Sequence, residues 1–322
     1  MATAEQIKSL IRSHLSDDDD ERFYSLALQV AAHEAQQGHG DLAHDIRDIV
    51  DKSRRARGGN VLLVKFPQDL AGMVLSEKSD TPVSALVLPD SLKERIRRII
   101  HEHRQQAKLK NHGLSNRRKI LLSGPPGTGK TMTARVLAHE LRLPLHTIQV
   151  DKLVTKFMGE TSAKLRQIFD LIRDEPGVYL FDEFDAIAGD RSLDNDVGEM
   201  RRVLNALLQF IEQDASDSLI VGATNNPALL DRALFRRFDD VLTYSAPDRD
   251  ARRRLFENVL GTFKAGRLVW KKILDESEGL SHAEIDHACR DAIKEAILQD
   301  RKAVNTDVLA KTLRERRQTH QR

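Results

Sequence analysis

The sequence predicts an α/β fold: a parallel β-sheet flanked by helices, with a helical domain before it and a small all-helical domain, the lid, after it. Between Lys119 and Tyr244, short apolar runs alternate with segments of helical periodicity, which is typical of strand–helix–strand units. Residues 1–51 and the chain after Pro247 carry apolar residues at helical spacing without strand patterns. We therefore expect an N-terminal domain at 1–58, a linker or irregular segment at 59–88, the α/β core at 89–246 and the lid at 247–322.

The N-terminal domain, residues 1–58, is expected to be helical and to act as an adaptor for a partner. Ser16 and Asp17–Asp20 have the composition of a helix start, because carboxylates there meet unpaired backbone N–H groups. Residues 1–51 contain eleven Asp or Glu and only four Lys or Arg, although the whole chain has a net charge of +2. An acidic head on a basic body indicates separate modules and offers a docking surface.

The elements of the core follow in order. Residues 61–90 are apolar but interrupted by prolines, and they receive no assignment. A helix is expected over Asp90–Lys110, since Leu92 and Ile96 would lie on one side of it. The predicted strands are the apolar runs Ile120–Leu122, His146–Val150, Val178–Phe181, Leu219–Ala223 and Val241–Tyr244.

Composition excludes several classes of protein. Cys289 is the single cysteine, so an intramolecular disulfide framework and a cysteine-based zinc cluster are excluded. No apolar run approaches the ~18 residues of a membrane helix, and the polar N-terminus is unlike a signal peptide. We expect a cytoplasmic protein without a membrane partner.

A glycine-rich run follows the first predicted strand: Gly124, Pro125, Pro126, Gly127, Thr128, Gly129, Lys130 and Thr131. It fits Gly-x-x-x-x-Gly-Lys-Ser/Thr and opens a helix that contains Met132, which is the context that this phosphate-binding motif needs. Backbone N–H groups and the helix N-terminus would surround the phosphates. Lys130 is expected to pair with the β- and γ-phosphates and Thr131 to ligate Mg²⁺, so residues 124–132 form the predicted nucleotide site.

Two carboxylates end the third predicted strand. Asp182 and Glu183 follow Phe181 roughly 50 residues after the phosphate motif, where a strand supplies the second half of a nucleotide site. Asp182 is expected to hold Mg²⁺ through water, and Glu183 to polarise the attacking water as general base. The alternative is a strand whose acids cap the next helix.

Together these motifs resemble the AAA-type ATPases, over about Leu88 to Leu298. Besides the phosphate motif, the resemblance is carried by Gly113–Ser115, Asp182–Asp185, Ala223–Asn225, Ala233–Asp239 and Gly279–Glu284. It implies a P-loop ATPase that hydrolyses ATP with Mg²⁺ and forms a homo-oligomer, expected to be a hexamer.

The resemblance also implies roles for single residues. Asn225 is similar to the polar sensor that orients water near the γ-phosphate. Arg236 and Arg237 resemble arginine fingers, which enter the neighbouring subunit's site and stabilise charge in the transition state; the alternative is a pair of surface arginines. Gly113 occupies a position near the adenine in the family, and Ala283 is expected to pack near the base.

The lid departs from the family pattern at one position. Ser281-x-x-Glu284 is a capping box at a helix start, but His282 stands where the family usually has a small glycine. We expect His282 to be an exposed residue at the helix start.

Phe157, Met158 and Gly159 resemble the substrate-gripping pore loop of the family, in which an aromatic wedges against any polypeptide. The alternative is that Phe157 packs in the core. The expected function is a ring-forming ATPase that unfolds or remodels proteins, and the main alternative is a nucleic-acid motor or loader. The basic tail Lys311–Arg322 would suit the second function, or would be a solvated, frayed helix end.

No protease motif is present in the sequence, so a peptidase would be another chain. Some bacterial ATPases with a short helical head, which this chain resembles, are paired with a subtilisin-like serine protease. That resemblance makes a separate serine protease a possible partner.

Overall fold

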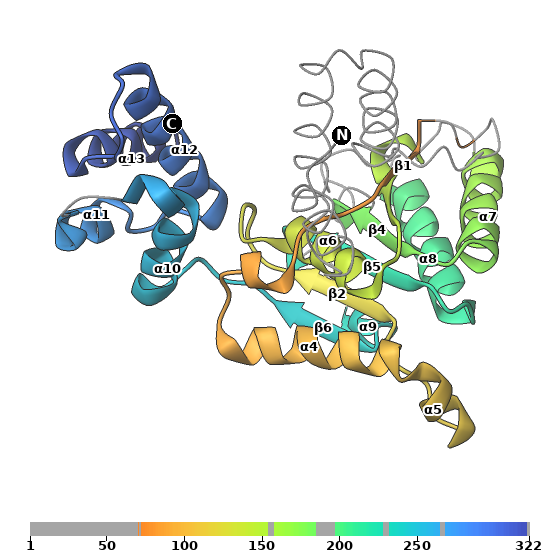
Figure 1. Ribbon diagram of the computed structural model, residues 1–322. Helices are drawn as coiled ribbons and strands as arrows, with labels where there is room; N and C mark the ends of the chain where they lie inside the picture. The colour runs from red at the N-terminus through yellow and green to blue at the C-terminus, as the bar shows by residue number, and fades with distance from the viewer. Residues whose placement is uncertain are drawn as a thin grey trace, which may run out of the picture. The chain divides into compact units, whose positions relative to one another are not determined.

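The computed structural model in Figure 1 describes Leu70 and residues 72–153, 158–184, 197–227, 232–264 and 268–320. The chain divides into two compact units, Met1–Val61 and Leu62–Arg322. The predicted helices of the N-terminal domain lie outside the described residues.

One six-stranded sheet forms the centre of the second unit, in the order β1-β3-β4-β5-β2-β6. The strands are β1 (Val74–Glu77), β2 (Lys119–Ser123), β3 (Leu145–Gln149), β4 (Val178–Asp182), β5 (Leu219–Thr224) and β6 (Asp240–Thr243). All pairs except β1–β3 are parallel. The α/β class and the five predicted strands are confirmed.

Strand β1 is an element that sequence analysis did not assign. It pairs antiparallel with β3 at the edge of the sheet, from Val74↔Ile148 to Glu77↔Leu145. Its side chains alternate between buried and more exposed positions, but four residues are too few for a clear period-two signal. The 3₁₀ turn Val83–Ala85 follows it.

Helices cover both faces of the sheet. An apolar cluster joins one face to α7 (Met158–Asp174) and α8 (Val197–Gln213), and a second joins the other face to α4 (Asp90–Arg104) and α6 (Lys130–Leu141). Leu121 of β2 belongs to the first cluster, whereas its neighbours Ile120 and Leu122 belong to the second. This alternation is what a strand buried on both faces requires. Two short helices, α5 (Gln106–Asn111) and α9 (Arg232–Phe235), complete the core.

The lid is all-helical and has its own apolar cluster. Its helices are α10 (Arg249–Leu260), α11 (Trp270–Glu276), α12 (His282–Leu298) and α13 (Thr306–His320), with a 3₁₀ turn at Gly261–Lys264. The single cysteine, Cys289, is fully buried in this cluster, and burial raises the pKa of its thiol. The thiol is therefore an unreactive core group.

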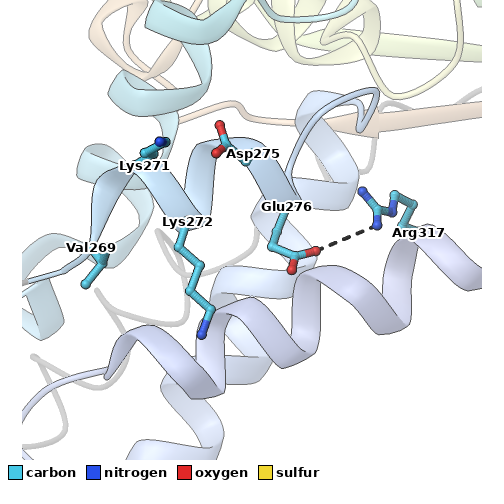
Figure 2. A pocket seen from close by; sticks show the side chains of 6 residues that line it. All are labelled: Val269, Lys271, Lys272, Asp275, Glu276 and Arg317. Atoms are coloured by element: carbon cyan, nitrogen blue, oxygen red, sulfur yellow. Dashed lines mark ion pairs between the residues drawn. The ribbon is translucent and has the colours of Figure 1, made fainter.

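The basic tail is largely part of α13, which reaches His320, and three of its arginines meet carboxylates within the lid. Arg314 and Arg317 lie 3.6 and 3.7 Å from Glu276, and Arg316 lies 2.6 Å from Asp291. Figure 2 shows the Arg317–Glu276 pair in a groove of about 550 Å³ lined by Val269, Lys271, Lys272, Asp275, Glu276 and Arg317. These arginines hold α13 against α11 and α12, so the described part of the tail, up to His320, is a packed helix.

None of the helices in the described ranges combines the length and the apolar character that crossing a membrane requires.

His146 of β3 is a titratable group inside the core. It is 1% exposed, its Nδ1 lies 2.6 Å from Ser76 Oγ, and its ring stacks on Tyr179 at 4.6 Å. Burial lowers the pKa of His146 to about 4, whereas a histidine in the unfolded chain titrates near ~6.5. The unfolded state therefore binds the proton more readily than the folded state between these values.

We expect this histidine to make the free energy of unfolding fall with acidification. Its contribution is complete above pH ~6.5 and decreases by about 3 kcal/mol as the pH drops toward 4. Urea unfolding at several pH values should show His146→Phe with a shallower slope over this range, while His101→Phe, which replaces an exposed histidine, keeps the wild-type slope. Equal slopes for wild type and His146→Phe would contradict the assignment.

Candidate nucleotide site

The glycine-rich loop connects β2 to α6, as its sequence predicts. Gly124 has φ +152°, and a Cβ built there would overlap the carbonyl oxygen of Tyr244, so only glycine fits. Gly129 caps α6 with φ +99° in the left-handed region. The loop therefore has a backbone that brings N–H groups together at a helix N-terminus, which is an anion-binding arrangement.

Lys130 is held inside this loop. Its Nζ donates hydrogen bonds to the carbonyl oxygens of Gly124 at 2.7 Å and Pro125 at 2.8 Å. Thr128 Oγ1 also donates to the Pro125 oxygen, at 2.7 Å. The ammonium group is thus placed at the loop where phosphates would lie. Pro125 and Pro126 are exposed, and Met132 packs against the apolar cluster of α4 and α6.

Two oxygen ligands meet beside the loop. Thr131 Oγ1 donates to Asp182 Oδ2 at 3.0 Å, although the residues are 51 positions apart in the chain. A hydroxyl and a carboxylate next to a phosphate site fit Mg²⁺, which is usually bound by one or two protein oxygens together with phosphate oxygens and waters. Among the described residues, no group of three or more His, Cys, Asp or Glu is arranged for a metal.

Glu183 lies directly after β4 in a strained backbone conformation. Its φ is +53°, and its N–H donates to Asp182 Oδ1 at 2.9 Å. Glu183 is exposed. Positive φ in a residue other than glycine is uncommon and clusters at functional sites, so this turn is consistent with a chemical role for the carboxylate.

Asn225 follows β5, which lies between β4 and β2 in the sheet. The residue before it, Thr224, accepts a hydrogen bond from the N–H of Gly124 at 3.2 Å and is paired with Ser123 in the ladder. Asn225 therefore lies at the carboxyl ends of the parallel strands, between the phosphate loop and Asp182.

Arg236 and Arg237 lie near the amino ends of the parallel strands, opposite the phosphate loop. They follow α9 and precede the amino end of β6, whereas the phosphate loop follows the carboxyl end of the adjacent parallel strand β2. Five strand residues separate the two edges by about 16 Å, which is beyond the reach of an arginine side chain. The arginines also differ, because Arg237 is 3.3 Å from Glu212 while Arg236 is exposed and forms no ion pair with any described residue.

Gly113 lies ahead of β2, the first predicted strand of the core, as expected, and its position near the adenine stays a prediction. Gly113 follows α5 and precedes β2, so it lies at the amino end of the strand whose carboxyl end carries the phosphate loop. Its N–H donates to Lys110 at 3.0 Å, and the next residue, Leu114, is 60% exposed.

The first turn of α12 contacts the phosphate loop. The N–H of Ala283 donates to the Gly127 carbonyl at 3.0 Å. A Cβ built on Gly127 would lie 2.7 Å from Ser281 Oγ and 3.2 Å from Ala283 Cβ. Ser281 and Glu284 form the predicted capping box. Ala283 lies against the phosphate loop, and its expected contact with the base stays a prediction.

His282 is not the exposed residue that we expected. It is partly buried, and its Nε2 donates to the carbonyl oxygen of Val87 at 2.9 Å. Burial lowers the pKa of its ring, against the opposing effects of this hydrogen bond and Asp248. Sequence reasoning missed Val87, because only the fold brings residues 195 positions apart together.

The predicted pore loop is only partly described. Phe157 lies outside the described residues, while Met158 and Gly159 are the first two residues of α7, so the helix begins earlier than the sequence suggested.

Comparison with known proteins identifies relatives over almost the whole chain. The family model described as "ATPase family associated with various cellular activities (AAA)" matches residues 120–245. An uncharacterized AAA family ATPase, y4kL, of Sinorhizobium fredii is 34% identical over 312 residues, covering 94% of this chain and 92% of that protein. The proteasome-activating nucleotidase of Methanopyrus kandleri is 31% identical and covers 84% of this chain, which spans 66% of that protein.

A solved structure, the crystal structure of the FIGL-1 AAA domain, has the same fold. Its TM-score is 0.61 at 23% identity, covering 78% of this chain and 90% of that chain.

Proposed function

Because this chain belongs to the AAA family of ATPases and hydrolyses ATP, we propose that it assembles into a homohexameric ring that uses Mg²⁺-ATP to unfold or remodel protein substrates. One observation supports a ring. Arg236 and the phosphate loop of the same chain lie at opposite ends of the parallel strands β6 and β2, so the length of a strand separates them. The loop and the arginine are two halves of one site, and only a neighbouring subunit can bring them together.

The residues around the loop divide the chemistry among them. The loop N–H groups and Lys130 bind and orient the phosphates, and Ala283 borders the site from the lid. Thr131 and Asp182 would hold Mg²⁺, which neutralises phosphate charge when it is bound. Glu183 takes the proton of the attacking water as general base, and Asn225 orients that water.

Arg236 is the finger that we expect to dominate. An arginine already paired with Glu212 in its own subunit, as Arg237 is, must give up that pair to reach a neighbour. Arg236 has no such partner among the described residues and is free to stabilise the developing charge on the transferred phosphoryl group. Arg237 then supports the interface in a secondary role.

A protein substrate is supported by two observations. The sequence Phe157-Met158-Gly159 resembles a pore loop, and a relative that covers most of this chain is named proteasome-activating nucleotidase. Residues 1–58 would serve as the adaptor that recruits a substrate or a separate protease, and the lid would move as a rigid body against the core.

The nucleic-acid alternative has less support. Three arginines of the basic tail are paired with Glu276 and Asp291 inside the lid, which reduces the positive charge available to a phosphate backbone.

The proposal predicts that unfolded protein stimulates ATP turnover through Phe157. We expect casein, a protein without stable structure, to raise the turnover several-fold in wild type. Phe157→Ala should abolish this stimulation, because the loop loses the bulky group that grips the polypeptide, and Phe157→Tyr should retain it. The measurement is phosphate release with and without casein, and with DNA in its place.

The basal rate without casein separates the two parts of the proposal. Phe157→Ala should keep the basal rate if the residue acts on substrate, whereas a fall in both rates would indicate a core residue. Stimulation by DNA alone would reject the protein-remodelling function in favour of the nucleic-acid motor.

A further inference from the structure

The side chain of His282 connects the lid to the core through one hydrogen bond. Because a carbonyl oxygen can only accept, the bond to Val87 requires a proton on Nε2 of the ring. The other nitrogen, Nδ1, is buried and has no hydrogen-bond partner among the described residues. The ring therefore has one polar contact that holds it in place.

The segment that His282 contacts contributes side chains to two apolar clusters, the one that joins the sheet to α4 and α6 and the one inside the lid. Val87 is 5% exposed and belongs to the cluster of the lid, whereas Leu86 and Leu88 on either side belong to the cluster of the core. Leu86 has an extended backbone, in which successive side chains point in opposite directions. The segment Leu86–Leu88 is thus the place where lid and core pack on the same short piece of chain.

The residues on either side of His282 contact the phosphate loop. Ala283 donates its N–H to the carbonyl of Gly127, and Ser281 Oγ is within 2.7 Å of the Cβ position of that glycine. Three successive residues at the start of α12 therefore dock on two parts of the core, the loop and the segment Leu86–Leu88. A bond that fixes one of these contacts also favours the other.

We infer that His282 is a positioning residue for ATP, whose hydrogen bond to Val87 holds the first turn of α12 against the phosphate loop. The inference rests on the proposed nucleotide site at that loop. ATP binds the state in which this border of its site is complete, so its apparent dissociation constant is the intrinsic constant divided by the fraction of docked lid. Loss of one hydrogen bond of ordinary strength should weaken ATP binding about three- to tenfold.

Two variants isolate the hydrogen bond. His282→Met and His282→Gln introduce unbranched side chains of similar length, but only glutamine carries an N–H donor that can reach the Val87 carbonyl. We expect His282→Met to raise KM for ATP and the Kd of a fluorescent ATP analogue about three- to tenfold, with kcat changed less than about twofold. His282→Gln should remain within about twofold of wild type in both quantities.

Matched controls separate this role from general damage to the lid. His287 lies on the same helix and is exposed, so His287→Met should leave KM unchanged. The buried thiol of Cys289 reports whether the lid is folded, because the thiol reacts with a thiol reagent only when the helices of the lid unfold.

The inference is overturned if the Met and Gln variants have the same KM, whether raised or unchanged. If His282→Met exposes Cys289, the result for His282→Gln decides between the two explanations. Wild-type ATP affinity in His282→Gln supports the inference, whereas a loss of affinity equal to that of His282→Met rejects it. Failure of the wild type to bind ATP would instead reject the proposed nucleotide site.

Discussion

Glu183→Gln should bind ATP with wild-type affinity and hydrolyse it about 10²- to 10⁴-fold more slowly, the range that a general base contributes. Glutamine keeps the size of the side chain and its ability to accept a hydrogen bond, but it cannot take a proton from water. Glu183 lies in a strained turn beside Asp182, and the amide preserves that geometry. Phosphate release gives kcat, and a fluorescent ATP analogue gives the affinity.

Two comparisons make this result specific. Lys130→Ala should lose ATP binding itself, because it removes the cation held in the loop. Glu94→Gln, a change on the exposed side of α4, should alter neither quantity. Near-normal turnover in Glu183→Gln would assign the base to a different residue.

Arg236→Ala should lower kcat by about 10³-fold or more, which is the contribution of an arginine finger supplied by a neighbour. ATP affinity should change little, since the phosphate loop of the same subunit is intact and lies at the other edge of the sheet. Arg237→Ala should have a smaller effect, because this arginine already pairs with Glu212.

Mixed rings test whether the arginine acts between subunits. Rings co-assembled from Arg236→Ala and Lys130→Ala chains contain some interfaces where an intact loop meets an intact arginine. Random 1:1 mixing of a head-to-tail ring makes such sites about a quarter of the total, so activity should recover to roughly that fraction of wild type. Activity no higher than that of the separate variants would mean that Arg236 acts within its own chain or only supports the fold.

The parts predicted correctly from sequence are those fixed by local pattern. The five predicted strands, the phosphate loop and the capping box at Ser281 are each specified by a few consecutive residues, because apolar strand patterning, glycine backbone freedom and helix capping are short-range properties. The meeting of Thr131 and Asp182 follows from the same logic, because Asp182 ends β4 and Thr131 begins α6 just after the loop that follows the parallel strand β2.

The features that sequence reasoning missed depend on contacts between distant parts of the chain. Strand β1 exists because it pairs with β3, and its four residues contain no independent signal. His282 was expected in solvent, because the carbonyl it contacts is 195 residues away.

The length of β2 has a consequence for how the activity responds to the amount of protein. If Arg236 acts as the proposed finger, a chain that carries its loop and this arginine at opposite ends of the parallel strands has no complete site while it is alone. Turnover per chain should then rise steeply with protein concentration and vanish on dilution. Assembly of the subunits would therefore determine whether ATP is hydrolysed. Isolated subunits at low concentration in a cell would then not consume ATP.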